Sequence, residues 1–362
     1  MSTTCPSSVT SLATTTVRFL SVNANLWGNG RTRLNLQDNR RAKEIGSQVK
    51  ELGPCVAAIE ELWSRKLAGL MHRKIGEERY KFLYADTETF NGVRGILTDL
   101  KSRSPIPLPS KMIDKLAAMV LDYLLMHHYG KNSLWKGILS LVTPSMDIQM
   151  ALAQIITQYI LGAETYWGAG LGYFIESGYE VVESRLILHP PKTRTGLERF
   201  TKKGSHLTIV RTTGVNKVTI TMINTHLQEG ETREAIWART AQAEELDELA
   251  SSFTGPVILM GDINERERLK VYTILTRRLR DAYREMHPNG SADPGYTYDS
   301  RSSKDPFARR KGVPGIVGRL DFQLFRGMEP TACVNIKLRD IKGLPPTDHE
   351  AVLGTYEVPI LN

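Results

Sequence analysis

Five short segments of the sequence place side chains that can bind a metal ion or move a proton beside strand-like apolar runs. They are Val22-Asn23 with Asn25, Ile59-Glu60-Glu61, Ile220 to Gln228, Val257 to Asn264, and Thr347-Asp348-His349-Glu350. Carboxylates, amides and imidazoles are costly inside a buried strand unless they emerge at its end with partners. We therefore predict that these segments meet in one site at the edge of a sheet, and that the chain is an enzyme.

The carboxylate of Glu61, or that of its neighbour Glu60, is the expected centre of a metal site. Asn23 lies in an adjacent strand, and Asp348 offers a second acidic contact. Mg²⁺ prefers oxygen ligands, few carboxylates and retained waters, and it typically acts on phosphate oxygens. This combination predicts a Mg²⁺ site that handles a phosphate group.

Two imidazoles, those of His226 and His349, suit acid–base and charge-stabilising roles on opposite sides of a phosphorus atom. Asp321 is the lone carboxylate of its strand-like run, and a buried carboxylate there would fix the tautomer of His349 and raise its basicity. Asp262 and Asn264 alternate along an extended chain, so we expect both side chains on one side. One would orient the attacking water, and the other would donate to a non-bridging oxygen.

Each pattern also has an ordinary structural explanation. The Gly-Asp-Ile-Asn run would make a turn, Glu60-Glu61 the acidic first turn of a helix, and Asp348 a helix N-cap. A single His among the eight in the chain is more often a surface or satisfied core residue. We favour one site because five independent coincidences of this kind are improbable.

Composition is compatible with a soluble α/β enzyme. The 362 residues are 41% hydrophobic, which is enough for a sizeable core, and the net charge of +8 favours an anionic partner. The three cysteines, Cys5, Cys55 and Cys333, form neither a disulfide framework nor a zinc pattern, so we expect a cytoplasmic protein. The sequence contains no uninterrupted run of 18 apolar residues, so we expect no transmembrane helix.

Strand-like runs and helical periods alternate over most of the length, which predicts a single α/β domain over residues 17–360. Residues 1–16, rich in Ser and Thr, are expected to form a disordered tail. Residues 101–165 interrupt the alternation with broad apolar helical faces. A helical subdomain packed on the sheet edge is the favoured interpretation, and an amphipathic lid that contacts membrane or acyl chains is the alternative.

The order of these motifs resembles that of the endonuclease/exonuclease/phosphatase superfamily, the DNase I-like fold, and within it most of all that of neutral sphingomyelinases. The matching segments are Asn23 to Gly28, Glu60 to Trp63, Gly170-Leu171-Gly172 with Phe174, Lys203-Gly204, Thr225 to Gln228, Arg239 to Gln242, Gly261 to Asn264, Asp281 to Tyr283, Leu320 to Phe322, and Asp348 to Ala351. The resemblance spans about residues 17–357 and leaves the tail and residues 101–165 without a counterpart.

The resemblance implies a four-layer α/β/β/α sandwich with an inserted helical segment, and Mg²⁺-dependent cleavage of a phosphodiester. Position by position, it implies that Glu61, Asn23 and Asp348 serve the metal, with Asn25 as the alternative asparagine. It also implies that His349 is the general base, that Asp321 orients it, that His226 stabilises the transition state or protonates the leaving group, and that Asp262 and Asn264 hold water and phosphate. Thr347 stands where a Ser usually precedes Asp-His.

A phospholipid headgroup is the expected substrate, with peripheral membrane contact through residues 101–165. A DNase-like or abasic-site endonuclease acting on nucleic acid is the alternative, and it is favoured by the positive charge. A catalytically inactive binding module on the same fold is disfavoured, because no expected site residue is missing.

Overall fold

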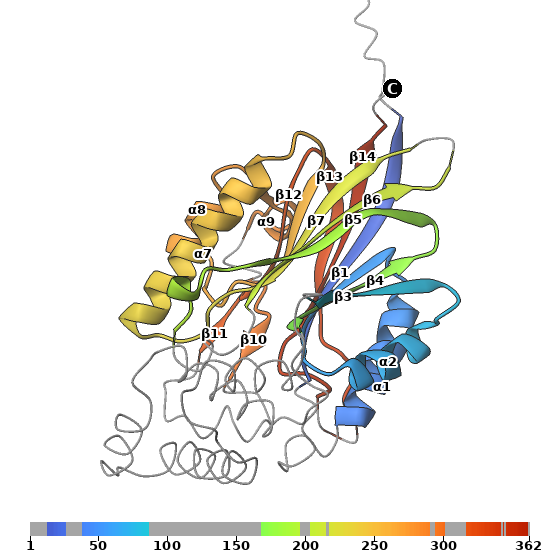
Figure 1. Cartoon of the computed structure of the whole chain (residues 1–362), viewed down its shortest axis with the longest axis horizontal. Coiled ribbons are helices and arrows are strands. Elements are labelled where there is room, and N and C mark those ends of the chain that lie inside the picture. Colours follow the sequence, from blue (N-terminus) through green and yellow to red (C-terminus); the bar gives the residue numbers. More distant parts are fainter. Residues whose placement is uncertain are drawn as a thin grey trace, which may run out of the picture.

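The computed structural model describes most of the chain and shows a layered α/β protein (Figure 1). The described residues are 13–26, 38–86, 168–195, 203–214, 217–289, 294–300, 316–341, 343 and 345–360. The predicted helical segment at residues 101–165 therefore lies outside them. None of the helices in the described ranges is both long and apolar enough to cross a membrane.

The first sheet has six strands in the described ranges, in the order β13-β14-β1-β2-β4-β3. The strands are β1 (Thr14–Leu26), β2 (Val56–Leu62), β3 (Tyr80–Asp86), β4 (Gly168–Glu176), β13 (Glu329–Ile336) and β14 (Ala351–Pro359). Only β1 and β2 among these pair in parallel, and helix α1 (Asp38–Leu52) connects them. A parallel pair needs such a crossover, so its two strands end at the same edge of the sheet.

The second sheet repeats this arrangement in the order β5-β6-β7-β8-β12-β9. Its strands are β5 (Tyr179–Leu188), β6 (Gly204–Thr212), β7 (Thr219–His226), β8 (Val257–Asp262), β9 (Arg280–Asp281) and β12 (Asp321–Arg326). The parallel pair is β7 and β8, and helix α7 (Arg233–Ser251) connects them. Each sheet therefore contains one parallel pair whose two strands end at the same edge of that sheet.

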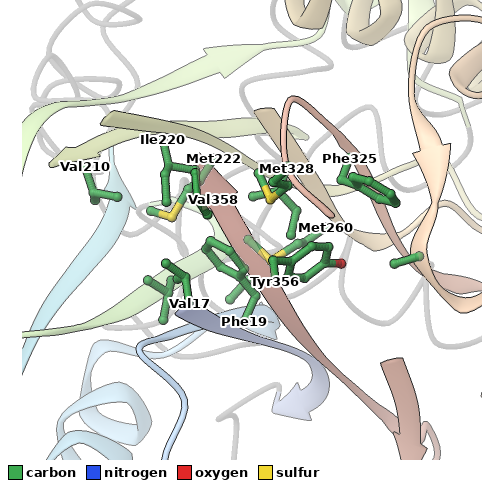
Figure 2. Packing of buried hydrophobic residues seen from close by; sticks show 14 of the residues in the cluster. Val17, Phe19, Val210, Ile220, Met222, Met260, Phe325, Met328, Tyr356 and Val358 are labelled. Carbon is green, nitrogen blue, oxygen red and sulfur yellow. The ribbon is translucent and has the colours of Figure 1, made fainter. Parts of the chain in front are cut away.

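The two sheets pack face to face through side chains that alternate along the strands. Val17 and Phe19 of β1 meet Ile220 and Met222 of β7 in one buried cluster (Figure 2). Their neighbours in sequence point outward, because successive side chains of a strand face opposite sides. The space between the sheets is therefore the principal core of the sandwich.

Helices cover the outer faces and complete four layers (Figure 1). Helix α1 and helix α2 (Arg65–Ile75) pack on the first sheet, and α7 and helix α8 (Lys270–Leu275) pack on the second. The predicted α/β/β/α sandwich is confirmed. Helix α7 buries Ala235 and Ala238 against the sheet, whereas Ile236 is 37% exposed.

The predicted boundary between tail and domain differs from the observed one. Strand β1 begins at Thr14, so residues 14–16 belong to the first sheet and not to a disordered tail. The hydroxyl groups of Thr14 and Thr16 donate to the carboxylate of Glu357 on β14, at 2.5 and 2.6 Å. These cross-strand contacts extend the sheet beyond the apolar run that starts at Val17.

Candidate active site

The alternation of the strands directs four polar residues into the space between the sheets, at the end where both parallel pairs finish. Asn23 follows Val17 and Phe19 on the inner face of β1, and His226, Asp262 and Asp321 occupy equivalent inner positions on β7, β8 and β12. All four side chains are buried. Strand parity alone therefore brings these four side chains together between the sheets.

Glu61 reaches this group through an unusual backbone conformation. Alternation puts Glu60 on the inner face, fully buried, and would point Glu61 outward together with Ile59. Instead Glu61 has φ 51°, in the left-handed region that non-glycine residues rarely adopt. Its Oε1 atom lies 3.2 Å from Nδ2 of Asn23 and 3.9 Å from Nε2 of His226. Backbone strain of this kind concentrates at functional sites.

Asn25 has the same left-handed conformation, with φ 46°. Its backbone N–H donates to Oδ1 of Asn23 at 3.1 Å, which turns the Nδ2 group of Asn23 towards Glu61 and Asp262. The side chain of Asn25 donates to Oδ1 of Asp348 at 2.9 Å. Asn23 therefore contacts the central carboxylates, whereas Asn25 holds the outer one.

Asn264 is the third strained residue, with φ 52°, and here the expected geometry was wrong. The chain is not extended, because the backbone N–H of Asn264 folds back to donate to Oδ1 of Asp262 at 2.7 Å. The side-chain amide of Asn264 donates to the carbonyl of Leu227 at 3.0 Å. Asp262 and Asn264 thus form a local turn in place of an alternating pair.

The turn requires glycine at position 261, both for its backbone conformation and for its packing. Its φ is 126°, and a Cβ at this position would lie 2.0 Å from the carbonyl oxygen of Thr225 on the neighbouring strand β7. Only glycine tolerates both conditions. The close approach aligns the ends of β7 and β8, which carry His226 and Asp262.

The carboxylates around Glu61 fit a hard divalent cation. Burial, followed by the charges of Asp348 and Glu229, raises the pKa of Glu61 to about 7. Clustered buried carboxylates repel each other, and a cation would reverse that effect. Glu61 and Asp348 offer the carboxylate oxygens that Mg²⁺ prefers, whereas Asn23 turns its Nδ2 group, which cannot ligate a metal, towards Glu61.

A second trio of donors lies beside the first. Asp262, Asp321 and His349 each offer one potential ligand atom, and these three atoms lie within 4.8 Å of one another. However, Nδ1 of His349 and Oδ2 of Asp321 already hydrogen-bond at 2.8 Å. That bond leaves Nε2 of His349 and Oδ1 of Asp321 as the atoms of these two residues that could ligate a cation.

His349 and Asp321 form a buried imidazole–carboxylate pair. Burial opposes the charged imidazole, but Asp321, Asp348 and Asp262 together raise the pKa of His349 well above its ordinary value. Since a carboxylate only accepts, Nδ1 of His349 carries the proton of this bond, and Nε2 is the nitrogen that can lose its proton and then act as a base. That Nε2 atom lies 3.9 Å from Oδ2 of Asp262.

His226 has the opposite electrostatic character. Burial, together with the positive charges of Lys203 and His349, lowers the pKa of His226 well below its ordinary value. Its Nε2 atom lies 3.8 Å from Oδ2 of Asp262 and 3.9 Å from Oε1 of Glu61. The site therefore holds one imidazole with a raised pKa and one that stays neutral.

Sequence reasoning assigned no role to several residues that support these groups. Lys203 is 2% exposed and donates from Nζ to the carbonyl of Leu227, the same oxygen that accepts from Asn264. The hydroxyl of Ser21 donates to the buried carboxyl of Glu60 at 3.2 Å. Ser21 could have been found from the sequence, because it lies on the inner face of β1 two residues before Asn23.

The sequence matches no protein-family model and no curated protein. Among solved structures, truncated TDP2 from Caenorhabditis elegans aligns with a TM-score of 0.55 and 16% identity, over 94% of this chain and 97% of that one.

Two further solved structures have similar folds. Sphingomyelinase C from Streptomyces griseocarneus aligns with a TM-score of 0.56 and 15% identity, over 94% of this chain and 99% of that one. An endonuclease/exonuclease/phosphatase from Bacteroides vulgatus aligns with a TM-score of 0.55 and 12% identity, over 95% and 99%. The chain therefore has the fold of the endonuclease/exonuclease/phosphatase superfamily, the DNase I-like fold.

Proposed function

We propose that the protein is a Mg²⁺-dependent phosphodiesterase that removes the headgroup of a phospholipid, as a phospholipase C of sphingomyelinase type does. One observation carries this proposal: three nitrogen atoms converge on Oδ2 of Asp262. Nδ2 of Asn23 lies 3.2 Å from it, Nε2 of His226 3.8 Å and Nε2 of His349 3.9 Å. The two longer separations exceed a direct hydrogen bond, so an oxygen of water or phosphate fits among these groups.

The metal side of the proposed site consists of the carboxylates of Glu61 and Asp348, and Asn23 would reach the metal through Oδ1, which now accepts from the N–H of Asn25. Asn25 holds Asp348 in place through its 2.9 Å hydrogen bond. A bound Mg²⁺ would supply positive charge to the phosphoryl oxygens as negative charge develops there.

His349 is the proposed general base. Asp321 occupies Nδ1, so Nε2 accepts a proton from the attacking water, which Asp262 orients. The oxygen of that water forms a bond to phosphorus as the bond from phosphorus to the lipid alcohol breaks. The products are an alcohol, which gains a proton, and a phosphomonoester.

His226 is the proposed stabiliser of the leaving side. Because its pKa is lowered, it remains neutral and can donate one N–H to a phosphoryl oxygen or to the leaving alcohol. We propose that Asn264 assists indirectly, since its backbone N–H fixes the carboxylate of Asp262.

The lipid substrate is supported by the neutral sphingomyelinase-like motifs and by the sphingomyelinase C structure among the similar folds. A nucleic-acid phosphodiesterase is the second candidate. The net charge of +8 favours it, and a similar structure is TDP2 from D. rerio with a single-strand DNA product. Both candidates use the same site chemistry.

A parallel assay separates the two candidates. The purified protein, with Mg²⁺, would be incubated with labelled sphingomyelin in mixed micelles, a lysophospholipid, plasmid DNA and single-stranded DNA. We expect phosphocholine release from sphingomyelin to exceed DNA cleavage. Cleavage of DNA alone would replace the lipid assignment with the nuclease one, and no cleavage of any phosphodiester would overturn both.

A further inference from the structure

Thr297 and Tyr298 connect the segments that carry the His349–Asp321 pair. Tyr298 begins the short strand β10 (Tyr298–Asp299), which pairs with β11 (Val317–Gly318), just before β12. On its other side Tyr298 forms an antiparallel bridge with His349. This two-residue element therefore lies between the chain that leads to Asp321 and the chain that carries His349.

Thr297 fixes the backbone on both sides of the pair. Its hydroxyl oxygen accepts the backbone N–H groups of Leu320 at 3.0 Å and Asp321 at 3.1 Å. Its carbonyl accepts the N–H of Glu350 at 2.7 Å. The side chain is 1% exposed, so each of these N–H groups would pay a desolvation penalty without its acceptor.

Tyr298 covers the imidazole itself. Residues directly opposite each other in an antiparallel pair project to the same face, so Tyr298 and His349 stand side by side. Their ring centroids are 4.8 Å apart, with 40° between the planes. An imidazole that rotated about its χ2 angle would have to displace this ring, and the rotation would break the 2.8 Å bond to Asp321.

We propose that Thr297 and Tyr298 are positioning residues that hold the imidazole of His349 against Asp321. Thr297 sets the separation of the two backbones, and the ring of Tyr298 restricts the rotation of the imidazole. Neither residue needs to touch substrate for this role. The catalytic consequence rests on the proposed phosphodiesterase function, whereas the geometric one does not.

The test compares ring removal with ring retention. Tyr298→Leu and Tyr298→Ala remove the aromatic ring, Tyr298→Phe keeps it, and Tyr296→Ala is the control because Tyr296 is 49% exposed in the same segment. We expect the Leu and Ala variants to lower kcat about tenfold to hundredfold with little change in KM, the scale of a misplaced catalytic group. The Phe variant and the control should stay close to wild type.

Thr297 is tested by a matched pair. Thr297→Val keeps the shape but removes the acceptor for two backbone N–H groups, whereas Thr297→Ser keeps the hydroxyl. We expect the Val variant to have a lower kcat than wild type and the Ser variant to keep a kcat close to that of wild type. Circular dichroism would be recorded for every variant, and Tyr298→Leu keeps the proposal testable if Tyr298→Ala does not fold.

A substrate-free measurement separates this inference from the proposed function. The Nδ1 proton of His349, held in its bond to Asp321, should give a low-field proton NMR signal in wild type and in Tyr298→Phe. We expect that signal to weaken or vanish in Tyr298→Leu. An unchanged signal and kcat in Tyr298→Leu would overturn the inference, and so would an equal loss in Tyr298→Phe, because the hydroxyl would then be the essential group. Wild type that shows the signal but cleaves no phosphodiester would overturn the proposed function alone.

Discussion

Nδ1 of His349 lies 2.8 Å from Oδ2 of Asp321, and this contact joins the two sheets of the sandwich. Asp321 begins β12 in the second sheet, whereas His349 precedes β14 in the first. The bond fixes the tautomer of the imidazole and leaves its Nε2 atom towards Asp262. The proton chemistry of the site therefore depends on how the sheets are held together at this end.

Asp321→Asn should move the acid limb of the pH–rate profile. The rate requires neutral His349, so it falls as the pH drops through the pKa of that imidazole, and Asp321 is the main group that raises this pKa. Without the charge the limb should shift to lower pH, while kcat falls because the imidazole is less basic and less well oriented. The measurement is kcat/KM against pH for both proteins. An acid limb at the same pH in the variant would contradict the assignment of His349 as base.

Glu61→Gln should abolish Mg²⁺ binding while the fold is retained. In the metal-free protein the pKa of Glu61 is raised to about 7, so below that pH the ion must displace a proton. We therefore expect the Kd for Mg²⁺ to weaken as pH falls from 8 to 6, with proton release. Isothermal titration calorimetry in buffers of different ionisation enthalpy measures both. Wild-type affinity in the variant, or a Kd independent of pH, would argue against Glu61 as ligand.

Glu60→Gln is the matched comparison for Glu61→Gln. The carboxyl of Glu60 is fully buried, and burial followed by the charge of Asp321 raises its pKa well above the ordinary value. A neutral amide of the same shape should therefore replace it with little loss of Tm or Mg²⁺ affinity. Loss of Mg²⁺ binding in this variant equal to that in Glu61→Gln would move the metal site to Glu60.

His226→Gln should lower kcat by about a hundredfold to a thousandfold, the weight of one hydrogen-bond donor to a developing negative charge. His226 is neutral because burial lowers its pKa, so its loss should leave the acid limb of the pH profile in place. Steady-state kinetics across pH would show a lower curve of the same shape. A variant that lost the acid limb would identify His226, and not His349, as the base.

Gly261→Ala should destabilise the protein and displace the site. The left-handed backbone alone costs an alanine about 1 kcal/mol or more, and the added Cβ would lie 2.0 Å from the carbonyl oxygen of Thr225. Gly255→Ala is the control, because nothing lies within 4 Å of the added atom there. Thermal unfolding should separate them clearly. Equal Tm values for the two variants would show that β7 and β8 tolerate a wider separation.

Strand parity explains why much of the site could be predicted from the sequence. Apolar residues at alternate positions mark the inner face, and Asn23, His226 and Asp262 continue that face at the ends of strands β1, β7 and β8. The pairing of His349 with Asp321 also matches the predicted geometry. Local periodicity is sufficient for these residues, because strand pairing keeps the inner-face positions of neighbouring strands on the same side of the sheet.

The remaining features depend on tertiary contacts that local patterns do not encode. Glu61, Asn25 and Asn264 adopt left-handed conformations, and the side chain of each hydrogen-bonds to a residue distant in sequence. Parity would have turned Glu61 away from the site. Thr297 and Tyr298 sit in a short connecting segment, where no periodicity marks their contact with His349.

The most direct test of the account is phosphodiester hydrolysis by wild type and His349→Ala, measured side by side with Mg²⁺ and with excess chelator. The substrates would be sphingomyelin and a small soluble phosphodiester, and circular dichroism would verify the fold of both proteins. We predict that wild type cleaves phosphodiester only with the metal, and that the variant loses about a hundredfold to ten-thousandfold of kcat. A folded His349→Ala protein with wild-type kcat, or full wild-type activity in excess chelator, would contradict it.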